Sequence, residues 1–300
     1  LIGRRFRLVH IMFSARKYIE VATFRSGKIK TASNGVIVEN NLYGTLKEDA
    51  FRRDFSVNAL YYDIQNFQVI DYVDGLEALK NSEIRIIGKP IERFEEDPVR
   101  MIRAIRFSVK LGAKIEPEVL KSISSQAYLL ANIPAARLYE ECIKLFHNEK
   151  SFEVFEQLLK FGLLKYLFSQ TKETSFINKT LMNTSKRIKN GKPVTPAFLF
   201  AVFLWDAQNK RFNELNKKKK SRILLMMQAS EDVISKQTKQ VLMPRWLSAR
   251  VKDIWQMQYQ LEEGCSQKKA KDLIVHPRFR MAYDFLVLRS ESINPELAER

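Results

Sequence analysis

The chain has 300 residues, which is enough for about two domains with a buried core. Its 51 Lys and Arg residues outnumber its 34 Asp and Glu residues and give a formal net charge of +17. This charge favours a polyanionic partner, because binding to a nucleic acid releases its counterions, although a generally basic solvated surface is the alternative. Cys142 and Cys265 stand far apart without CxxC spacing, so the sequence supports neither a disulfide framework nor a structural zinc site, and it agrees with a reducing cytoplasm.

The first third of the chain is predicted to be a small mixed domain. Residues 6–13 and 18–24 are apolar and β-branched and predict a strand pair, and residues 67–73 and 84–87 predict two further strands. The stretch from 25 to about 45 is rich in Ser, Lys, Gly and Asn, which is typical of a surface loop.

Helical periodicity dominates after residue 97. The predicted helices are 98–111, 116–129, 135–147, 151–161, 194–206, 212–228, 231–240, 245–262 and 278–289. Residues 197–205 form the longest strongly apolar stretch, about half of the ~20 residues that a transmembrane helix needs. This stretch predicts a buried helix, and no membrane partner is expected.

The predicted helix 98–111 has two contrasting faces. At about 100° per residue, apolar side chains gather on one side, whereas Arg100, Arg103, Arg106 and Lys110 fall on an opposite arc. Guanidinium groups at three-residue steps can grip phosphate oxygens and base edges with paired hydrogen bonds. An ordinary solvated face is an equally valid interpretation of the spacing.

Asp97 precedes Pro98, and an Asp cap followed by Pro at the first helical position is a common helix start. Capping by itself explains both residues. The carboxylate of a capping Asp can nevertheless also bind a ligand, so the two roles are compatible.

Two segments stand in the order and spacing of one enzyme family. Residues 52–60 read Arg-Arg-Asp-Phe-Ser-Val-Asn-Ala-Leu, and about 40 residues later residues 96–100 read Glu-Asp-Pro-Val-Arg. Together they resemble the paired motifs of the bacterial poly(A) polymerase and CCA-adding nucleotidyltransferases. An Arg-Asp dipeptide alone is typical of a surface ion pair, so the specificity lies in the complete pair of segments.

The resemblance implies an α+β, mainly α fold. Residues 1–95 would form a partial nucleotidyltransferase head with a few-stranded sheet, residues 96–150 a helical neck with the nucleotide-reading helix, and residues 151–300 a helical RNA-binding body.

The resemblance also implies the site residues. Asp54 would lie at the catalytic centre, and Glu20 is a second candidate there, although an exposed strand glutamate is at least as good an interpretation. Asp97 and Arg100 would read the base of the incoming nucleotide. The remaining nucleotide-binding candidates are Arg53, Asn58, Arg103, Arg106 and Arg137.

Nucleotidyl transfer uses two divalent ions, usually Mg²⁺, held by closely spaced carboxylates. In the family an Asp-x-Asp pair behind a Gly-Gly turn supplies two of these carboxylates, and this sequence contains neither pattern. The metal ligands are therefore unassigned. Because the chain also opens on Leu1 without Met, we expect a fragment that lacks the front of the enzyme.

The polyadenylating branch of the family is favoured by the opening residues 1–10 and by residues 21–25, 71–75, 196–201 and 276–284, which resemble that branch. The implied reaction transfers AMP from ATP to RNA 3′ ends. The alternatives are a CCA-adding enzyme, which would also incorporate CTP, and a non-catalytic RNA-binding remnant. The protein partners, the RNA preference and the oligomeric state are not predicted.

RNA would lie across the helical body. Its candidate contacts are Lys217, Lys218, Lys219, Lys220 and Arg222, although a lysine run is also typical of a solvated helix end. Three aromatic residues, Trp246, Trp255 and Tyr259, could stack on bases, but their helical spacing favours a place in the core.

Overall fold

A computed structural model describes residues 8–14, 17–26, 30–31, 37–39, 42–216, 221–262 and 267–293. The chain forms two compact units. Unit 1 consists of residues 1–100 and 111–123, and unit 2 of residues 101–110 and 124–300. Helix α4 (Val99–Leu111) begins in unit 1 and contributes most of its length to unit 2.

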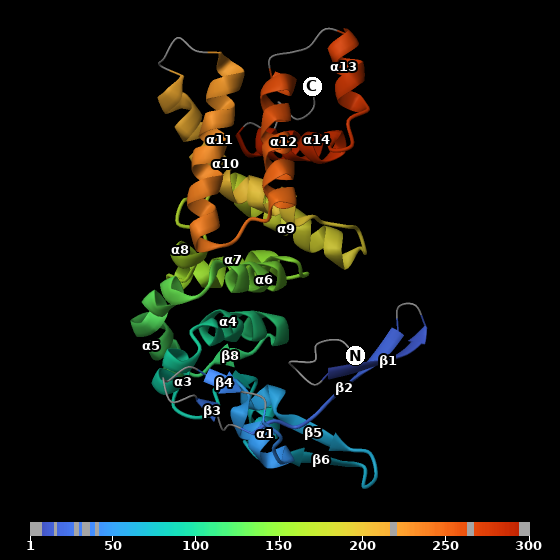
Figure 1. The fold of residues 1–300 in the computed structure, drawn as a ribbon, viewed down its shortest axis with the longest axis vertical. Coiled ribbons are helices and arrows are strands. Elements are labelled where there is room, and N and C mark those ends of the chain that lie inside the picture. The colour runs from blue at the N-terminus through green and yellow to red at the C-terminus, as the bar shows by residue number, and fades with distance from the viewer. Residues whose placement is uncertain are drawn as a thin grey trace. The chain divides into compact units, whose positions relative to one another are not determined.

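The strands of unit 1 form short two-stranded sheets. The pairs β1–β2, β3–β4 and β5–β6 are antiparallel, and β7–β8 is parallel. Figure 1 shows β1–β2 and β5–β6 as separate hairpins. The strand bounds are β1 Leu8–Ser14, β2 Lys17–Ala22, β3 Lys30–Thr31, β4 Ile37–Glu39, β5 Leu60–Asp63, β6 Gln68–Asp71, β7 Glu83–Ile84 and β8 Lys114–Ile115.

Short helices alternate with these strands along the chain. They are α1 Leu46–Arg52, the 3-10 turn η2 Ser56–Asn58, α2 Gly75–Lys80, α3 Pro90–Glu96 and α5 Pro117–Gln126, which begins in unit 1. The core of the unit contains Phe55, Ile84 and Phe94, which are fully buried. Burial of apolar side chains of this size is the main force that stabilises so small a unit.

The hairpin predicted near the start of the chain is confirmed, with Val9 opposite Val21 and His10 opposite Glu20. The loop predicted from 25 to 45 is wrong in part, since β3 and β4 pair within it, and the rest of that stretch includes positions outside the described residues. Of the strand predicted at 84–87, only Ile84 belongs to β7. Residues 85 and 87 instead bond to the segment around Asp54.

All the secondary-structure elements in the described residues of unit 2 are helices. Its elements after α4 are η3 Ala127–Asn132, α6 Ala135–Phe146, α7 Ser151–Lys160, α8 Leu164–Leu167, α9 Ser175–Lys189, α10 Pro196–Leu215, α11 Arg222–Gln240, α12 Arg245–Glu262, α13 Gln267–Ile274 and α14 Phe279–Ile293. Helix α10 packs against both α11 and α12, and the three lie side by side in Figure 1.

Aromatic side chains form the centre of this helical unit. The Phe203 ring lies 4.9 Å from those of Phe146 and Phe168, and it stacks on Phe155 at 5.9 Å between ring centroids. Residues 197–205 of α10 are all buried, which confirms the predicted buried helix. No described helix is long and apolar enough to cross a membrane.

Several helix predictions in unit 2 were wrong. A break between residues 206 and 212 was predicted, but α10 is continuous from Pro196 to Leu215. Helix α9 was not predicted, because its polar sequence hides the small buried face formed by residues such as Ile177 and Leu181. A break near residue 229 was predicted, but α11 is continuous, and the Ser230 hydroxyl donates to the Met226 carbonyl of its own helix at 2.9 Å. Helix α13 was not predicted either.

Candidate nucleotide site

The segment 52–60 is fastened to its own unit by backbone hydrogen bonds. Helix α1 begins at a capping box between Thr45 and Glu48 and ends at Arg52, with Arg53 as its C-cap. The chain then extends, and its peptide groups bond to residues 85–87: the Ile87 amide donates to the Asp54 carbonyl, and the Ser56 amide to the Arg85 carbonyl, both at 3.0 Å. These bonds fix the direction in which residues 53 and 54 point.

Gly75 allows the closest approach to this segment. A Cβ at Gly75 would lie 2.4 Å from the Ser56 carbonyl oxygen, well inside van der Waals contact. The glycine of the Asp71-Tyr72-Val73-Asp74-Gly75 segment is thus explained by packing of α2 against η2.

Arg93, on α3, also holds the backbone of the 52–60 segment. One nitrogen of its guanidinium, Nη2, donates to the carbonyls of Arg52 at 3.0 Å and Arg53 at 2.8 Å. Its Nη1 pairs with Glu96 at 2.5 Å. Arg93 therefore joins the backbone of the first motif to the glutamate of the second.

Arg100 lies at the junction of the two motifs and is only 6% exposed. Its Nε donates to Asp54 Oδ1 at 3.0 Å, and its Nη1 donates to Glu96 Oε2 at 2.7 Å and to the Arg93 carbonyl at 2.8 Å. Burial lowers the pKa of Arg100, but the hydrogen bonds from its guanidinium to the two carboxylates outweigh burial and raise it above its usual value.

The same contacts act on Glu96. Burial raises the pKa of its carboxyl, whereas hydrogen bonds and charge from Arg100 and Arg93 lower it, and the net pKa lies below the usual range. Asp54, Arg100, Glu96 and Arg93 therefore form one charged network, which we call the Asp54–Arg100 network.

Asp97 separates α3 from α4. Its Oδ1 accepts from the Val99 amide at 3.2 Å, and its carbonyl accepts from the Arg100 amide at 3.1 Å. The predicted capping role is confirmed, and it places the Asp97 carboxylate next to the start of the helix that carries Arg100.

A second polar cluster holds Arg53. The Arg53 Nε donates to Asp49 Oδ2 at 3.2 Å and to the Tyr61 hydroxyl at 3.0 Å, and Nη1 donates to the Asn58 carbonyl at 2.9 Å. The Arg53 guanidinium also lies 5.0 Å from the centre of the Tyr61 ring. Arg53 and Asn58 are therefore brought together, with Asn58 contributing its backbone carbonyl.

Asp49 is buried at the centre of this cluster and also accepts from the Tyr61 hydroxyl at 2.8 Å. Burial raises the pKa of Asp49, but hydrogen bonds from Tyr61 and from the Arg25 backbone, with the charges of Arg53 and Arg52, outweigh it and lower the pKa below its usual range. The carboxylate thus remains charged and fixes the Arg53 side chain.

The other predicted site residues lie in different surroundings. Arg103 and Arg106 follow Arg100 on α4, where they are half-buried, with guanidinium groups 5.8 Å and 4.4 Å from the Phe107 ring. Arg137 is exposed in the first turn of α6. Glu20 pairs across the hairpin with His10, whose Nε2 lies 3.3 Å from Glu20 Oε2.

The predicted RNA contacts are described only in part. Lys217, Lys218, Lys219 and Lys220 lie outside the described residues. Arg222 is described and lies over two rings, 5.7 Å from Phe212 and 5.6 Å from Tyr259. Trp255 and Tyr259 belong to the core, as their helical spacing indicates, whereas Trp246 is 46% exposed.

Four residues of these two networks were not singled out from the sequence: Asp49, Tyr61, Arg93 and Glu96. Three of them stand at helical ion-pair spacing from a partner. Asp49 is four residues before Arg53, Glu96 is four before Arg100, and Arg93 is three before Glu96. That spacing could have identified them. Tyr61 lies on a neighbouring strand, and nothing in the local sequence indicates its contact.

Three family models match parts of the chain. "Poly A polymerase head domain" matches residues 1–85, "Probable RNA and SrmB- binding site of polymerase A" matches residues 112–174, and "Polymerase A arginine-rich C-terminus" matches residues 205–299.

Several known proteins are similar over most of the chain. Poly(A) polymerase I of Escherichia coli O157:H7 is 40% identical over 97% of this chain and 66% of its own length. Poly(A) polymerase I of Haemophilus influenzae is 37% identical over 100% of this chain and 70% of its own length. The CCA-adding enzyme of Staphylococcus saprophyticus is 30% identical over 80% of this chain and 58% of its own length. The chain thus spans about two thirds of the length of these poly(A) polymerases.

Solved structures share the fold. A structure described as a tRNA-processing enzyme with CTP matches with a TM-score of 0.65 and 19% identity, over 99% of this chain and 75% of that one. A tRNA nucleotidyltransferase with a primer tRNA and an ATP analogue matches with a TM-score of 0.58 and 21% identity, over 99% of this chain and 82% of that one. The mainly helical α+β fold predicted from the sequence is confirmed. Because its sequence is similar to these poly(A) polymerases over 97% to 100% of its own length, this chain belongs to the bacterial poly(A) polymerase family.

Proposed function

We propose that this chain provides the nucleotide-selecting and RNA-binding parts of a polynucleotide adenylyltransferase, which transfers AMP from ATP to RNA 3′ ends. The observation that carries the proposal is the Asp54–Arg100 network, because Arg100 of the second motif segment donates to Asp54 of the first at 3.0 Å. A poly(A) polymerase I is 40% identical over 97% of the chain, whereas a CCA-adding enzyme is 30% identical over 80% of it. This difference supports polyadenylation rather than CCA addition.

In this proposal each residue has a stated task. Asp97 and Arg100 read the adenine, and Arg100 does so through Nη2, since its Nε and Nη1 are engaged with Asp54, Glu96 and a carbonyl. A guanidinium fixed on two sides loses little entropy when a base binds to the third. Asp54 lies at the catalytic centre, and the other proposed nucleotide-binding residues are Arg53, Asn58, Arg103, Arg106 and Arg137.

Magnesium is implied by the family, and the described residues do not by themselves fit it. Within the described ranges no three His, Cys, Asp or Glu side chains cluster as metal ligands. The Asp54 carboxylate, which is the one candidate ligand carried over by the resemblance, is bound to a guanidinium. We therefore derive no step through a metal ion. The proposed location is the cytoplasm, in agreement with the free, buried thiol of Cys142.

The first test measures nucleotide choice. The chain is titrated with ATP and with CTP in the presence of Mg²⁺, and in parallel with a labelled short RNA, whose extension is followed by product length. We expect ATP to bind more tightly than CTP, and Asp97→Asn to reduce this preference while RNA binding is retained.

Each other result favours a different function. Equal binding of ATP and CTP, or extension by both, would indicate a CCA-adding enzyme. RNA binding with no binding of either nucleotide would indicate a non-catalytic RNA-binding protein, and the proposed nucleotide site would be wrong. The matched control is Glu92→Gln, which changes one exposed carboxylate of α3 outside the network.

A further inference from the structure

Helices α11 and α12 enclose a groove of about 560 Å³ in unit 2. One stripe of each helix faces it, at the i, i+3, i+4, i+7 spacing of a single helical face. The lining residues are Glu231, Ile234, Ser235, Thr238, Lys239, Met243, Arg245, Ser248, Ala249 and Lys252. We call this feature the α11–α12 groove.

The charges of the groove suit a polyanion. Three cationic side chains line it against one carboxylate, and the Lys252 ammonium is paired with that carboxylate, Glu231. Within residues 221–262, neither Lys239 nor Arg245 forms an ion pair, which leaves two uncompensated charges. The Ser235 and Thr238 hydroxyls also line the groove and are further donors for phosphate oxygens, whereas the Ser248 hydroxyl donates to the Met243 carbonyl at 3.2 Å.

A stacking platform lies beside this groove. Trp246 follows Arg245 directly on α12 and is 46% exposed, whereas Trp255 of the same helix is fully buried. The Arg250 guanidinium lies 5.1 Å from the Trp246 ring centre, one turn further along. An exposed tryptophan beside an arginine is a surface on which an unpaired base stacks.

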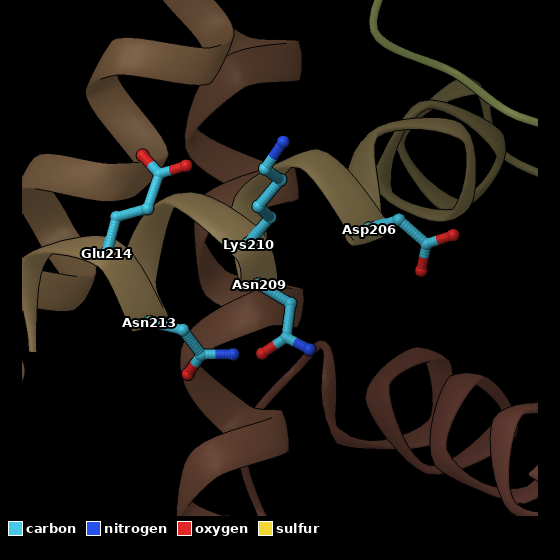
Figure 2. Close-up of a pocket in the computed structure, with 5 residues that line it drawn as sticks. All are labelled: Asp206, Asn209, Lys210, Asn213 and Glu214. Carbon is cyan, nitrogen blue, oxygen red and sulfur yellow. The ribbon is translucent and has the colours of Figure 1, made fainter.

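Other clefts of unit 2 have a different charge. A cleft of about 520 Å³ along α10 is lined by Asp206, Asn209, Lys210, Asn213 and Glu214, so that carboxylates outnumber ammonium groups. Figure 2 shows the Asn209 and Asn213 amides on one side of this helix and the Lys210 and Glu214 side chains on another. In a third pocket Arg187 and Arg280 both approach Asp284, at 4.0 Å and 3.0 Å.

We propose that the α11–α12 groove binds the phosphodiester backbone of single-stranded RNA, with Lys239 and Arg245 on phosphates and Trp246 stacked on a base. The inference rests on the proposed RNA substrate and specifies where it is held. The RNA is single-stranded because stacking on Trp246 requires a base that is not already stacked in a duplex.

The test separates phosphate contacts from stacking. Anisotropy of a labelled oligoadenylate RNA gives the dissociation constant over a range of salt concentrations. For Lys239→Gln/Arg245→Gln, we expect weaker binding and a slope of log K against log salt that is smaller by about 1.4, since each single-strand phosphate contact contributes about 0.7. For Trp246→Ala, we expect about ten-fold weaker binding with an unchanged slope.

The matched control is Lys172→Gln/Lys210→Gln, which removes the same charge from exposed positions outside the groove. Equal losses of affinity and slope in the control and in the groove variant would show that the groove is not the RNA-binding surface. The proposal that the chain binds RNA would be unaffected by that result. Absence of RNA binding by the unaltered chain would instead reject the proposed function as well. Equally effective displacement of the RNA by polyglutamate would overturn the assignment in favour of an acidic protein partner.

Discussion

Arg100 is the residue on which the candidate site depends most. A buried guanidinium is tolerated only where its charge and its N–H groups are satisfied. Asp54, Glu96 and a backbone carbonyl meet that requirement here. Asp54 therefore has a structural task in addition to its proposed catalytic one, and the two tasks are separated by measuring stability apart from activity.

Asp54→Ala is expected to destabilise the chain by about 1–3 kcal/mol, because it leaves the buried Arg100 Nε without its acceptor while Glu96 and the Arg93 carbonyl remain. Urea denaturation followed by circular dichroism measures this change. Glu92→Ala, which removes the exposed partner of Lys89, should alter stability by no more than about 0.5 kcal/mol. Equal effects of the two substitutions would contradict the role of Asp54.

The burial of His147 leads us to expect that the stability of the chain depends on pH. Its Nε2 lies 3.2 Å from the Val194 carbonyl, and within the described part of the chain its buried Nδ1 has no hydrogen-bond partner. Burial lowers the pKa of His147, although the bond to Val194 acts in the opposite direction. In the folded state the imidazole therefore resists protonation, whereas in the unfolded chain it takes up a proton near its ordinary pKa of about 6.5.

The contribution of His147 to the free energy of unfolding should consequently be fully present above pH ~6.5. It should fall as the pH decreases towards the lowered pKa of the folded state, since the unfolded chain binds more protons in that window. The free energy of unfolding is compared at pH 5, 6 and 7.5. His147→Gln, whose amide can still donate to Val194, should weaken this dependence. An unchanged pH profile in that variant would show that other groups cause it.

At the scale of elements, α12 has one buried face and one exposed face. One face is part of the core, where the Trp255 indole N–H donates to the Ala201 carbonyl of α10 at 3.0 Å. The opposite side carries exposed residues, among them Trp246. Helical periodicity by itself places both tryptophans near apolar positions, and only the packing of α10 and α11 against α12 decides which one is buried.

Trp255→Ala should therefore cost about 3–5 kcal/mol of stability, through lost burial and a cavity. Trp246→Ala, the same substitution on the same helix, should cost less than about 1 kcal/mol. Thermal or urea unfolding measures both. A large loss of stability for Trp246→Ala would mean that this side chain is needed for packing. Weaker RNA binding by that variant could then not be attributed to lost stacking.

At the scale of the whole molecule, the chain consists of two units that each have a core. Phe55 and Phe94 are buried in unit 1, and the rings around Phe203 are buried in unit 2. Separate cores imply that local damage is confined to the unit in which it occurs. Asp54 and Arg100 belong to unit 1 and the α11–α12 groove belongs to unit 2, so the cores that support them can be perturbed one at a time.

Amide hydrogen exchange should show this independence. Asp54→Ala should reduce protection mainly in unit 1, and Trp255→Ala mainly in unit 2, because each substitution removes contacts within its own unit. The unaltered chain is the reference for both. Loss of protection across both units after either substitution would show that the chain unfolds as one cooperative unit.

Much of the molecule follows from the sequence by itself. Local patterns determined the first hairpin, the buried helix at 197–205, the cap at Asp97 and the excess positive charge, because each depends on neighbouring residues or on composition. The order of the two motif segments also identified the family. Weakly amphipathic helices such as α9 were not predictable, since their burial depends on partners far along the chain.

Only the tertiary structure decided which charged residues meet. Asp54 and Arg100 are 46 residues apart and yet form the pair at the centre of the candidate site. Tyr61 joins Asp49 and Arg53 from another element, and the α11–α12 groove exists only where two helices lie together. The physical reason is that sequence periodicity fixes the face on which a side chain lies, whereas the packing of that face against distant elements fixes its partners.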